Sequence, residues 1–100
     1  MDAGAPVSEL RNLGPKSREW LAAIGIRSVE DLRRAGAVPA YVALKRSRAG
    51  VSLNALYALV GALEGAHWLD VKRERRLELV MQVEDYERRH PPESTAQTGP

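Results

Sequence analysis

Residues 12–32 read NLGPKSREWLAAIGIRSVEDL and carry the marks of two short helices joined by a tight turn. Pro15 follows Gly14 and suits the first turn of a helix, because the N–H that proline lacks would have no acceptor there. Gly25 favours the left-handed backbone conformation that ends many helices. A helix is therefore predicted to begin at Pro15 and to end just before Gly25. The apolar side chains that recur on it at helical spacing are Trp20, Leu21 and Ile24.

The rest of the chain carries similar helix punctuation. Ser28, Ser52 and Asp70 each precede a segment of periodic apolar residues, and each can accept a hydrogen bond from the first turn of a helix. Pro39 opens a further segment at a position where proline is tolerated. No stretch alternates apolar and polar residues as a half-buried strand does. The predicted helices span residues 15–24, 29–34, 39–48, 53–64 and 71–89.

The segment LNALYALVGALE, residues 53–64, is apolar on most sides and is expected to lie at the centre of one core. Gly61 interrupts its helix-forming residues at a cost of about 1 kcal/mol relative to alanine. We expect the close approach of a neighbouring helix at Gly61 to offset this cost. In a chain without phenylalanine, the two tryptophans are expected to fill the core rather than to stack on bases. The predicted core residues are Trp20, Leu21, Ile24, Leu32, Leu44, Leu56, Tyr57, Val60, Leu63 and Trp68.

The predicted last helix, residues 71–89, opens with a basic run that lies unfavourably at the positive end of the helix dipole. Four side chains farther along are expected to dock on the core. Two others are expected to lie off that face, where they could supply an apolar stripe for a partner helix. The first set is Leu77, Val80, Met81 and Tyr86, and the second is Leu79 and Val83.

The composition narrows the class of protein. The chain has 100 residues, which suits a single domain, and it has no cysteine, which excludes disulfides and zinc–thiolate sites. No apolar run approaches the roughly 20 residues of a membrane span, and residues 1–10 lack the layout of a signal peptide. We therefore expect a soluble, cytoplasmic protein without a membrane partner.

The net charge of +2 is unevenly distributed along the chain, since residues 11–50 carry +6 and the segments before and after each carry −2. Such a local field can steer a polyanion.

The residues on which most enzymes depend are sparse. His67 and His90, the only histidines, flank the predicted last helix, and neither belongs to a spacing typical of metal ligands. His67 is expected to pack or to cap a helix. No serine stands in a nucleophile motif, and no phosphate loop of the GxxxxGK type occurs. We expect no catalytic activity, no cofactor and no metal.

The loop NLGPKS, residues 12–17, resembles the hairpin of helix-hairpin-helix motifs, which usually reads Gly-hydrophobic-Gly-Pro-Lys-Thr. Asn12 replaces the first glycine and Ser17 replaces the threonine; asparagine tolerates a positive φ better than most residues do. The resemblance implies that main-chain N–H groups at the start of a helix hold a DNA phosphate, aided by a nearby lysine or arginine. The residues implied in this contact are Gly14, Lys16, Ser17 and Arg18, with Lys45, Arg46 and Arg48 adding backbone contacts if they share the same face.

The longer stretch from about Leu10 to about Val83 resembles the C-terminal domain of TfoX/Sxy-type competence regulators, chiefly through NLGPKS, SVEDL and GVSLNALYALVGALEGAHW. The expected fold class is all-α: a compact orthogonal bundle of about five helices, similar to helix-hairpin-helix and SAM-like folds. The helical domain is expected at residues 9–90, between a flexible N-terminus (1–8) and a disordered tail (91–100). Because the chain has no room for the α/β domain that precedes this one in such regulators, we expect a stand-alone domain.

Two functions remain open at this point. TfoX proteins promote the expression of bacterial DNA-uptake genes, together with the cyclic-AMP receptor protein. The resemblance implies a regulatory adaptor with weak, sequence-independent affinity for duplex DNA, or one that acts with a transcription factor or another regulatory protein. The alternative is a protein-interaction or dimerisation module that binds no DNA, since fold does not decide function. The acidic side chains of Glu84, Asp85 and Glu87 would repel DNA.

Overall fold

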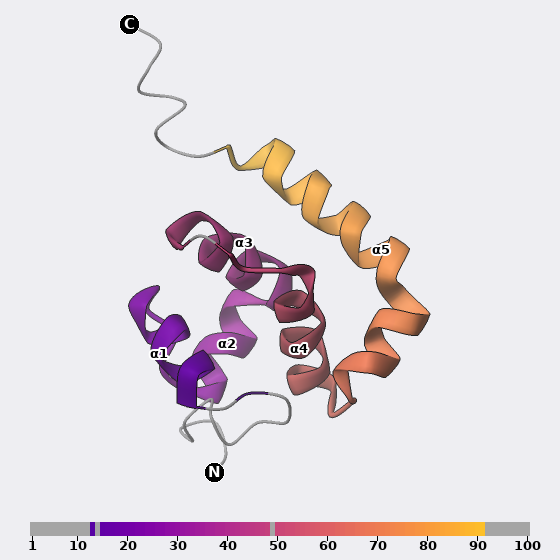
Figure 1. Ribbon diagram of the computed structural model, residues 1–100. Coiled ribbons are helices and arrows are strands. Elements are labelled where there is room, and N and C mark those ends of the chain that lie inside the picture. The colour runs from indigo at the N-terminus through magenta and orange to yellow at the C-terminus, as the bar shows by residue number, and fades with distance from the viewer. Residues whose placement is uncertain (1–12, 14, 49, 92–100) are drawn as a thin grey trace, which may run out of the picture.

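The computed structural model describes residues 13, 15–48 and 50–91 of the chain. These residues form five helices and, apart from an isolated bridge position at Ser28, no β-structure, which confirms the predicted all-α class (Figure 1). The helices are α1 (Pro15–Ala23), α2 (Val29–Ala35), α3 (Ala37–Ser47), α4 (Leu53–Glu64) and α5 (Trp68–Arg89).

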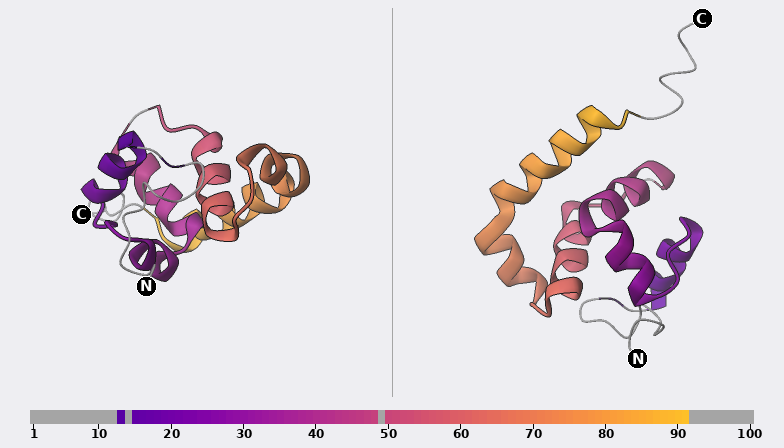
Figure 2. Two further views of the ribbon diagram at one scale, coloured as in Figure 1. Left: turned by 90° about the horizontal axis from the view of Figure 1, so that it is seen from below. Right: turned by 180° about the vertical axis from the view of Figure 1, so that it is seen from behind.

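Helix α4 is the centre of the fold. In Figures 1 and 2 it lies between α5 on one side and the remaining helices on the other, and it contacts both α3 and α5. Helix α5 forms a long arm that follows the outside of α4 and then reaches the end of α3. The segments predicted as a flexible N-terminus (residues 1–8) and, beyond Pro91, as a disordered tail lie outside the described residues.

The core forms where α4 faces its neighbours. Leu56 of α4 and Leu32 of α2 are both 0% exposed. Each predicted core residue belongs to one contiguous cluster, as expected, but the degree of burial differs. Leu21, Leu32, Leu44, Leu56, Tyr57 and Val60 are buried, whereas Trp20, Ile24, Leu63 and Trp68 are partly buried and pack against the buried residues.

A single glycine, Gly36, separates α2 from α3. Its N–H donates to the carbonyl of Leu32 at 2.8 Å, and its φ of 90° lies in the left-handed region that residues with a Cβ rarely adopt. Helix α3 then begins at Ala37, so the predicted start at Pro39 was wrong by two residues. Proline fits inside this first turn because the first N–H groups of a helix have no acceptor within the helix.

Helix α5 also begins earlier than predicted, and its N-cap is His67 rather than Asp70. The Nδ1 atom of His67 accepts a hydrogen bond from the N–H of Leu69 at 3.1 Å. This confirms the capping role that was one of the two expected of the histidine. Asp70 lies inside the first turn instead, where its charge is favourable at the positive end of the helix dipole.

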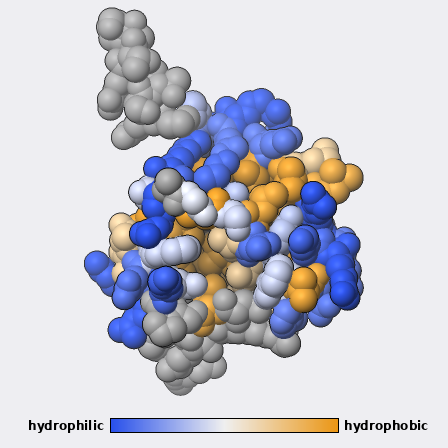
Figure 3. All heavy atoms as spheres, viewed as in Figure 1, coloured by the Kyte–Doolittle hydropathy of each residue, from blue (hydrophilic) through white to orange (hydrophobic). Residues whose placement is uncertain are grey.

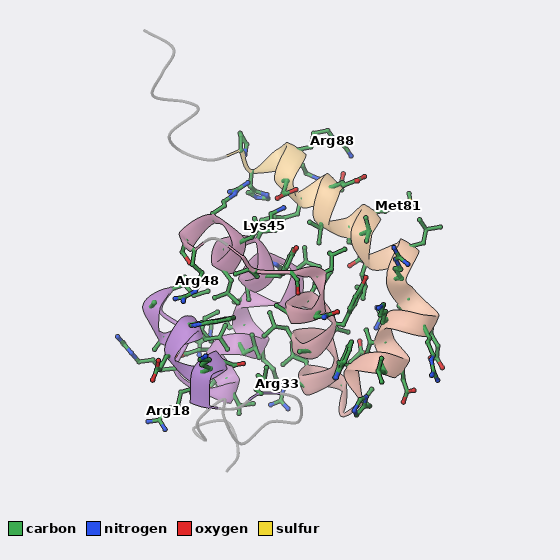
Figure 4. The ribbon with its side chains drawn as sticks, viewed as in Figure 1. Arg18, Arg33, Lys45, Arg48, Met81 and Arg88 are labelled. Atoms are coloured by element: carbon green, nitrogen blue, oxygen red, sulfur yellow. The ribbon has the colours of Figure 1, made fainter. Side chains whose placement is uncertain are left out.

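The face of α5 that docks on the core is not the predicted one. Leu79 and Val83 are buried, whereas Leu77 is 73% exposed and Met81 is 59% exposed. Figure 3 shows apolar side chains at the outer edge of α5, and in Figure 4 Met81 projects away from the other helices. The exposed apolar stripe is therefore formed by Leu77 and Met81. Of the other two residues predicted to dock, Tyr86 packs against the core and Val80 is half-buried.

Arg75 explains why this face was missed. It stands one helical turn before Leu79 and two before Val83, and so it continues the row of α5 that faces the core. Its charge is matched by two carboxylates. The Nε and Nη2 atoms donate to Glu78 at 3.1 and 3.2 Å, and Nη1 donates to the two carboxylate oxygens of Glu64 at 2.9 and 2.7 Å. An arginine can therefore lie in a row that is otherwise apolar.

Helix α5 also bends at Arg75, whose φ of −129° and ψ of 16° are not helical. The bend directs the first part of α5 along α4 and the second part toward the end of α3 (Figure 1). There the Nζ atom of Lys45 lies 2.6 Å from Oε2 of Glu87. Although α5 has 22 residues, neither it nor any other helix in the described part of the chain is long and apolar enough to cross a membrane.

The Arg75 contact makes a prediction about Glu78. Hydrogen bonds from the Arg75 guanidinium hold the pKa of Glu78 below its ordinary value. We expect Arg75→Met to raise this pKa toward the ordinary glutamate range in an NMR titration of the side-chain carboxyl carbon. The folded-state pKa of Glu78 is depressed. The stabilisation that the Arg75–Glu78 contact gives the folded state is therefore present above the unfolded-state pKa of Glu78, and it is lost as the pH falls through the folded-state pKa. The difference in unfolding free energy between wild type and Arg75→Met should therefore shrink at acid pH.

The matched control for this titration is Arg73→Met, because Arg73 lies on the same helix and forms no ion pair with any described residue. Its removal should leave the pKa of Glu78 where it is. An equal shift in both variants would mean that the general field of α5, rather than the Arg75 contact, sets this pKa.

Candidate nucleic-acid interface

Helix α1 begins with two cations that form no ion pair within the described part of the chain. Lys16 and Arg18 are exposed and form no ion pair with any described residue, while Ser17 between them is half-buried. The first turn of α1 holds no acidic side chain, so positive charge lies at the positive end of the helix dipole. A bound anion would relieve this arrangement. Gly14, the fourth residue predicted for this loop, lies outside the described residues.

The main chain at the same place provides hydrogen-bond donors. The N–H groups of Lys16 and Ser17 belong to the first turn, where no acceptor is available within the helix. Within the described ranges, no other oxygen accepts a hydrogen bond from either group. Donors of this kind, together with the helix dipole, bind phosphate oxygens at many helix N-termini. The start of α1 therefore has both the donors and the charge for an anion.

Arg48, from the second group of predicted site residues, lies next to α1. Its guanidinium carbon is 4.5 Å from the centre of the Trp20 ring, which is a cation–π contact (Figure 4). Trp20, Ser17 and Trp68 also line an open hollow of about 300 Å³ beside the start of α4. Both tryptophans pack against the core, so they form the wall of this hollow rather than free platforms for bases.

Lys45 and Arg46 make their polar contacts with residues at the end of α5. The ammonium group of Lys45 pairs with Glu87, as described above, and the Nη2 atom of Arg46 donates to the carbonyl of His90 at 2.6 Å. Both side chains are thus engaged in contacts with residues at the end of α5. Of the three cations expected to extend the loop, the structure brings Arg48 to α1 and directs the other two to the end of α5.

Helix α2 supplies a cation that the sequence analysis did not include in the site. Arg33 is exposed and forms no ion pair with any residue that the structure describes. In the view of Figure 4, its side chain and that of Arg18 extend toward the same end of the molecule. The neighbouring Arg34 pairs instead with Glu30 at 3.1 Å. The spacing of Glu30 and Arg34 at i and i+4 was the signal that could have separated the two arginines.

The end of α5 differs from the start of α1 in how its positive charges are paired. Arg88 and Arg89, near the end of α5, both contact the carboxylate of Asp85. Hydrogen bonds from these two arginines hold the pKa of Asp85 below its ordinary value. Both arginines therefore have a carboxylate partner there, whereas Lys16 and Arg18 have none among the described residues.

The two histidines lie at opposite ends of α5 and make structural contacts. His67 caps the helix, and the ring of His90 stacks on Tyr86 with ring centres 4.2 Å apart. In the part of the chain that the structure describes, no group of three histidine, cysteine or acidic side chains is arranged to hold a metal ion.

Comparison with known proteins identifies the family. A family model described as the TfoX C-terminal domain matches residues 4–83, which include α1 to α4 and most of α5. A crystal structure of a protein from Listeria monocytogenes, described as uncharacterized, is 29% identical and has a TM-score of 0.72; the match covers 83% of this chain and 94% of that one. A search of curated proteins gave no match. The chain belongs to the TfoX C-terminal domain family.

Proposed function

We propose that this chain is a non-catalytic regulatory adaptor of the TfoX type that acts in the bacterial cytoplasm and contacts duplex DNA weakly at the start of α1. Membership of the TfoX C-terminal domain family supports the regulatory role, and the competence-related role implied by the sequence resemblance is part of the proposal. The contacts made by the two histidines give no support to a catalytic role.

The observation that carries the DNA contact is the pair of cations at the start of α1. Lys16 and Arg18 are exposed beside first-turn N–H groups and have no carboxylate partner among the described residues. Each phosphate neutralised by such a side chain releases counterions, which drives sequence-independent binding. Phosphate contacts position a protein on DNA without reading the bases. The expected role is therefore that of an adaptor rather than of a base reader.

Lys16→Ala is expected to weaken binding of a short labelled duplex and to lower the slope of log K against log salt concentration by about one unit. The melting temperature should stay nearly unchanged, because Lys16 is exposed. Fluorescence anisotropy at several salt concentrations measures the slope, and thermal unfolding followed by circular dichroism checks the fold.

Arg88→Ala is the control for this experiment. Arg88 is exposed but paired with Asp85, and in Figure 4 it lies at the opposite end of the molecule from Arg18. It should leave the salt slope nearly unchanged. If Lys16→Ala has no effect on DNA binding, or if both variants lower the slope equally, the phosphate contact at α1 is wrong.

The second candidate function is a protein-interaction module that binds no DNA. The observation that favours it is the exposure of Leu77 and Met81 on α5. Chemical-shift mapping with the same duplex separates the two functions. Shifts at Lys16 and Ser17 support the DNA adaptor, whereas shifts confined to α5, or no shifts, support the interaction module.

A further inference from the structure

A groove lies between the start of α4 and the part of α5 near its bend. It has a volume of about 630 Å³ and forms where Leu53, at the start of α4, lies near Leu77 and Val80 of α5. Leu77 is the most exposed of the large apolar residues in the described chain, and Met81 lies one turn farther along the same helix. A group of exposed apolar side chains rimmed by polar ones is typical of an interaction site.

The rim of this groove is positively charged. Arg73 and Arg76 line it, with Glu74 as the one carboxylate of its described lining. Neither arginine forms an ion pair with a described residue, and neither does the adjacent Lys72, whereas Arg75 between them is fully engaged by two carboxylates. The groove thus has an apolar floor, and the described residues of its rim carry a net positive charge.

We propose that this groove binds an amphipathic helix of an acidic partner protein. In helix-in-groove recognition, apolar side chains spaced at i, i+3, i+4 and i+7 on the ligand enter an apolar groove. Here they would cover Leu77 and Val80, and carboxylates flanking them would face Arg73 and Arg76. Such charge complementarity accelerates association and selects against basic partners. The proposal goes beyond the DNA contact at α1 and does not depend on it.

Two other occupants fit the groove less well. Nucleic acid would match the charge of the rim, but its phosphates would leave the side chain of Leu77 in a polar environment. A second copy of the chain, paired through the same groove, would bring Arg73 and Arg76 of both copies to one interface. Like charges in facing positions destabilise such a pairing. An acidic helix satisfies both the apolar floor and the basic rim.

Two synthetic peptides test the proposal with the full chain. The first has leucine at i, i+3, i+4 and i+7 and glutamate at its other positions, and in the second every glutamate is replaced by lysine. Titration calorimetry is expected to show that the acidic peptide binds at least about tenfold more tightly than the basic one. Chemical shifts should map to residues 73–80. Leu77→Ser and Arg76→Ala should each weaken the acidic peptide about tenfold, as truncation of central interface residues does, without lowering the melting temperature.

Arg33→Ala is the matched control, because Arg33 is an exposed and unpaired cation of α2 outside the groove. Neither it nor Lys16→Ala should change the affinity for the acidic peptide, which keeps this test separate from that of DNA binding. Equal affinity for the two peptides, or equal weakening by Arg33→Ala, would overturn the proposal. So would displacement of the peptide by duplex DNA, or a dimer in sedimentation analysis that Leu77→Ser abolishes.

Discussion

Leu56→Ala is expected to lower the free energy of unfolding by about 2–5 kcal/mol, the range found when a buried leucine is reduced to alanine. Leu56 is 0% exposed and lies in α4, which contacts both α3 and α5. The substitution removes buried apolar atoms and leaves a cavity that the surrounding helices can fill only in part. Small domains are stable by about 5–15 kcal/mol in total, so this loss would be a large fraction of the whole. Urea unfolding followed by far-ultraviolet circular dichroism measures it.

Leu77→Ala is the matched control, since it makes the same chemical change on a helix at a site that is 73% exposed. Its effect on the free energy of unfolding is expected to stay within about 0.5 kcal/mol. Equal losses in the two variants would mean that α4 is not the centre of the core.

The helix ends that could be predicted are those that depend on residues within one turn. The side chains of Ser28 and Ser52 accept hydrogen bonds from N–H groups of the helices they precede, as expected of N-caps. Gly65 ends α4 with a φ of 73°, which only a residue without Cβ adopts readily. The start of α5 was mistaken because His67 and Asp70 can both accept such a hydrogen bond. Which of them caps the helix depends on where the chain leaves α4, and local sequence does not specify that.

The orientation of α5 could not be predicted from spacing alone. Leu77 and Met81 are four residues apart, and so are Leu79 and Val83, so both pairs satisfy the helical repeat equally well. The row that faces the core contains Leu79 and Val83, and the charged Arg75 in the same row made it look polar. Its partner Glu64 belongs to α4, so only the packed structure shows that the charge of Arg75 is compensated.

Contacts between residues far apart in the sequence also determine which of the predicted site residues lie together. Lys45, Arg46 and Arg48 are close together in the sequence and were expected to act as one group. The partners of the first two, Glu87 and the carbonyl of His90, come about 40 residues later in the chain. The prediction for Lys16 and Arg18 did not depend on a partner far away in the sequence. Both side chains are exposed in the structure, as the sequence suggested.

Gly61→Leu is expected to destabilise the protein by about 1–3 kcal/mol, the usual cost of adding side-chain volume to a packed interior. Gly61 is buried within α4, the helix between α5 and the rest of the bundle (Figure 1). Leucine is a far better helix former than glycine, by close to 1 kcal/mol, so the two effects oppose each other. Burial decides the sign, because a leucine side chain at a buried position must displace its neighbours. The melting temperature is therefore expected to fall.

Asn54→Leu isolates the effect of helix propensity, since Asn54 lies in the same helix but is exposed. It adds a leucine to α4 without requiring space in the core, and its melting temperature should not fall. A higher melting temperature for Gly61→Leu would mean that no neighbouring helix lies close to this position. The glycine would then weaken α4 without any compensating contact. A fall in Gly61→Leu alone would instead show that this position has no room for a larger side chain, as the close approach of a neighbouring helix requires.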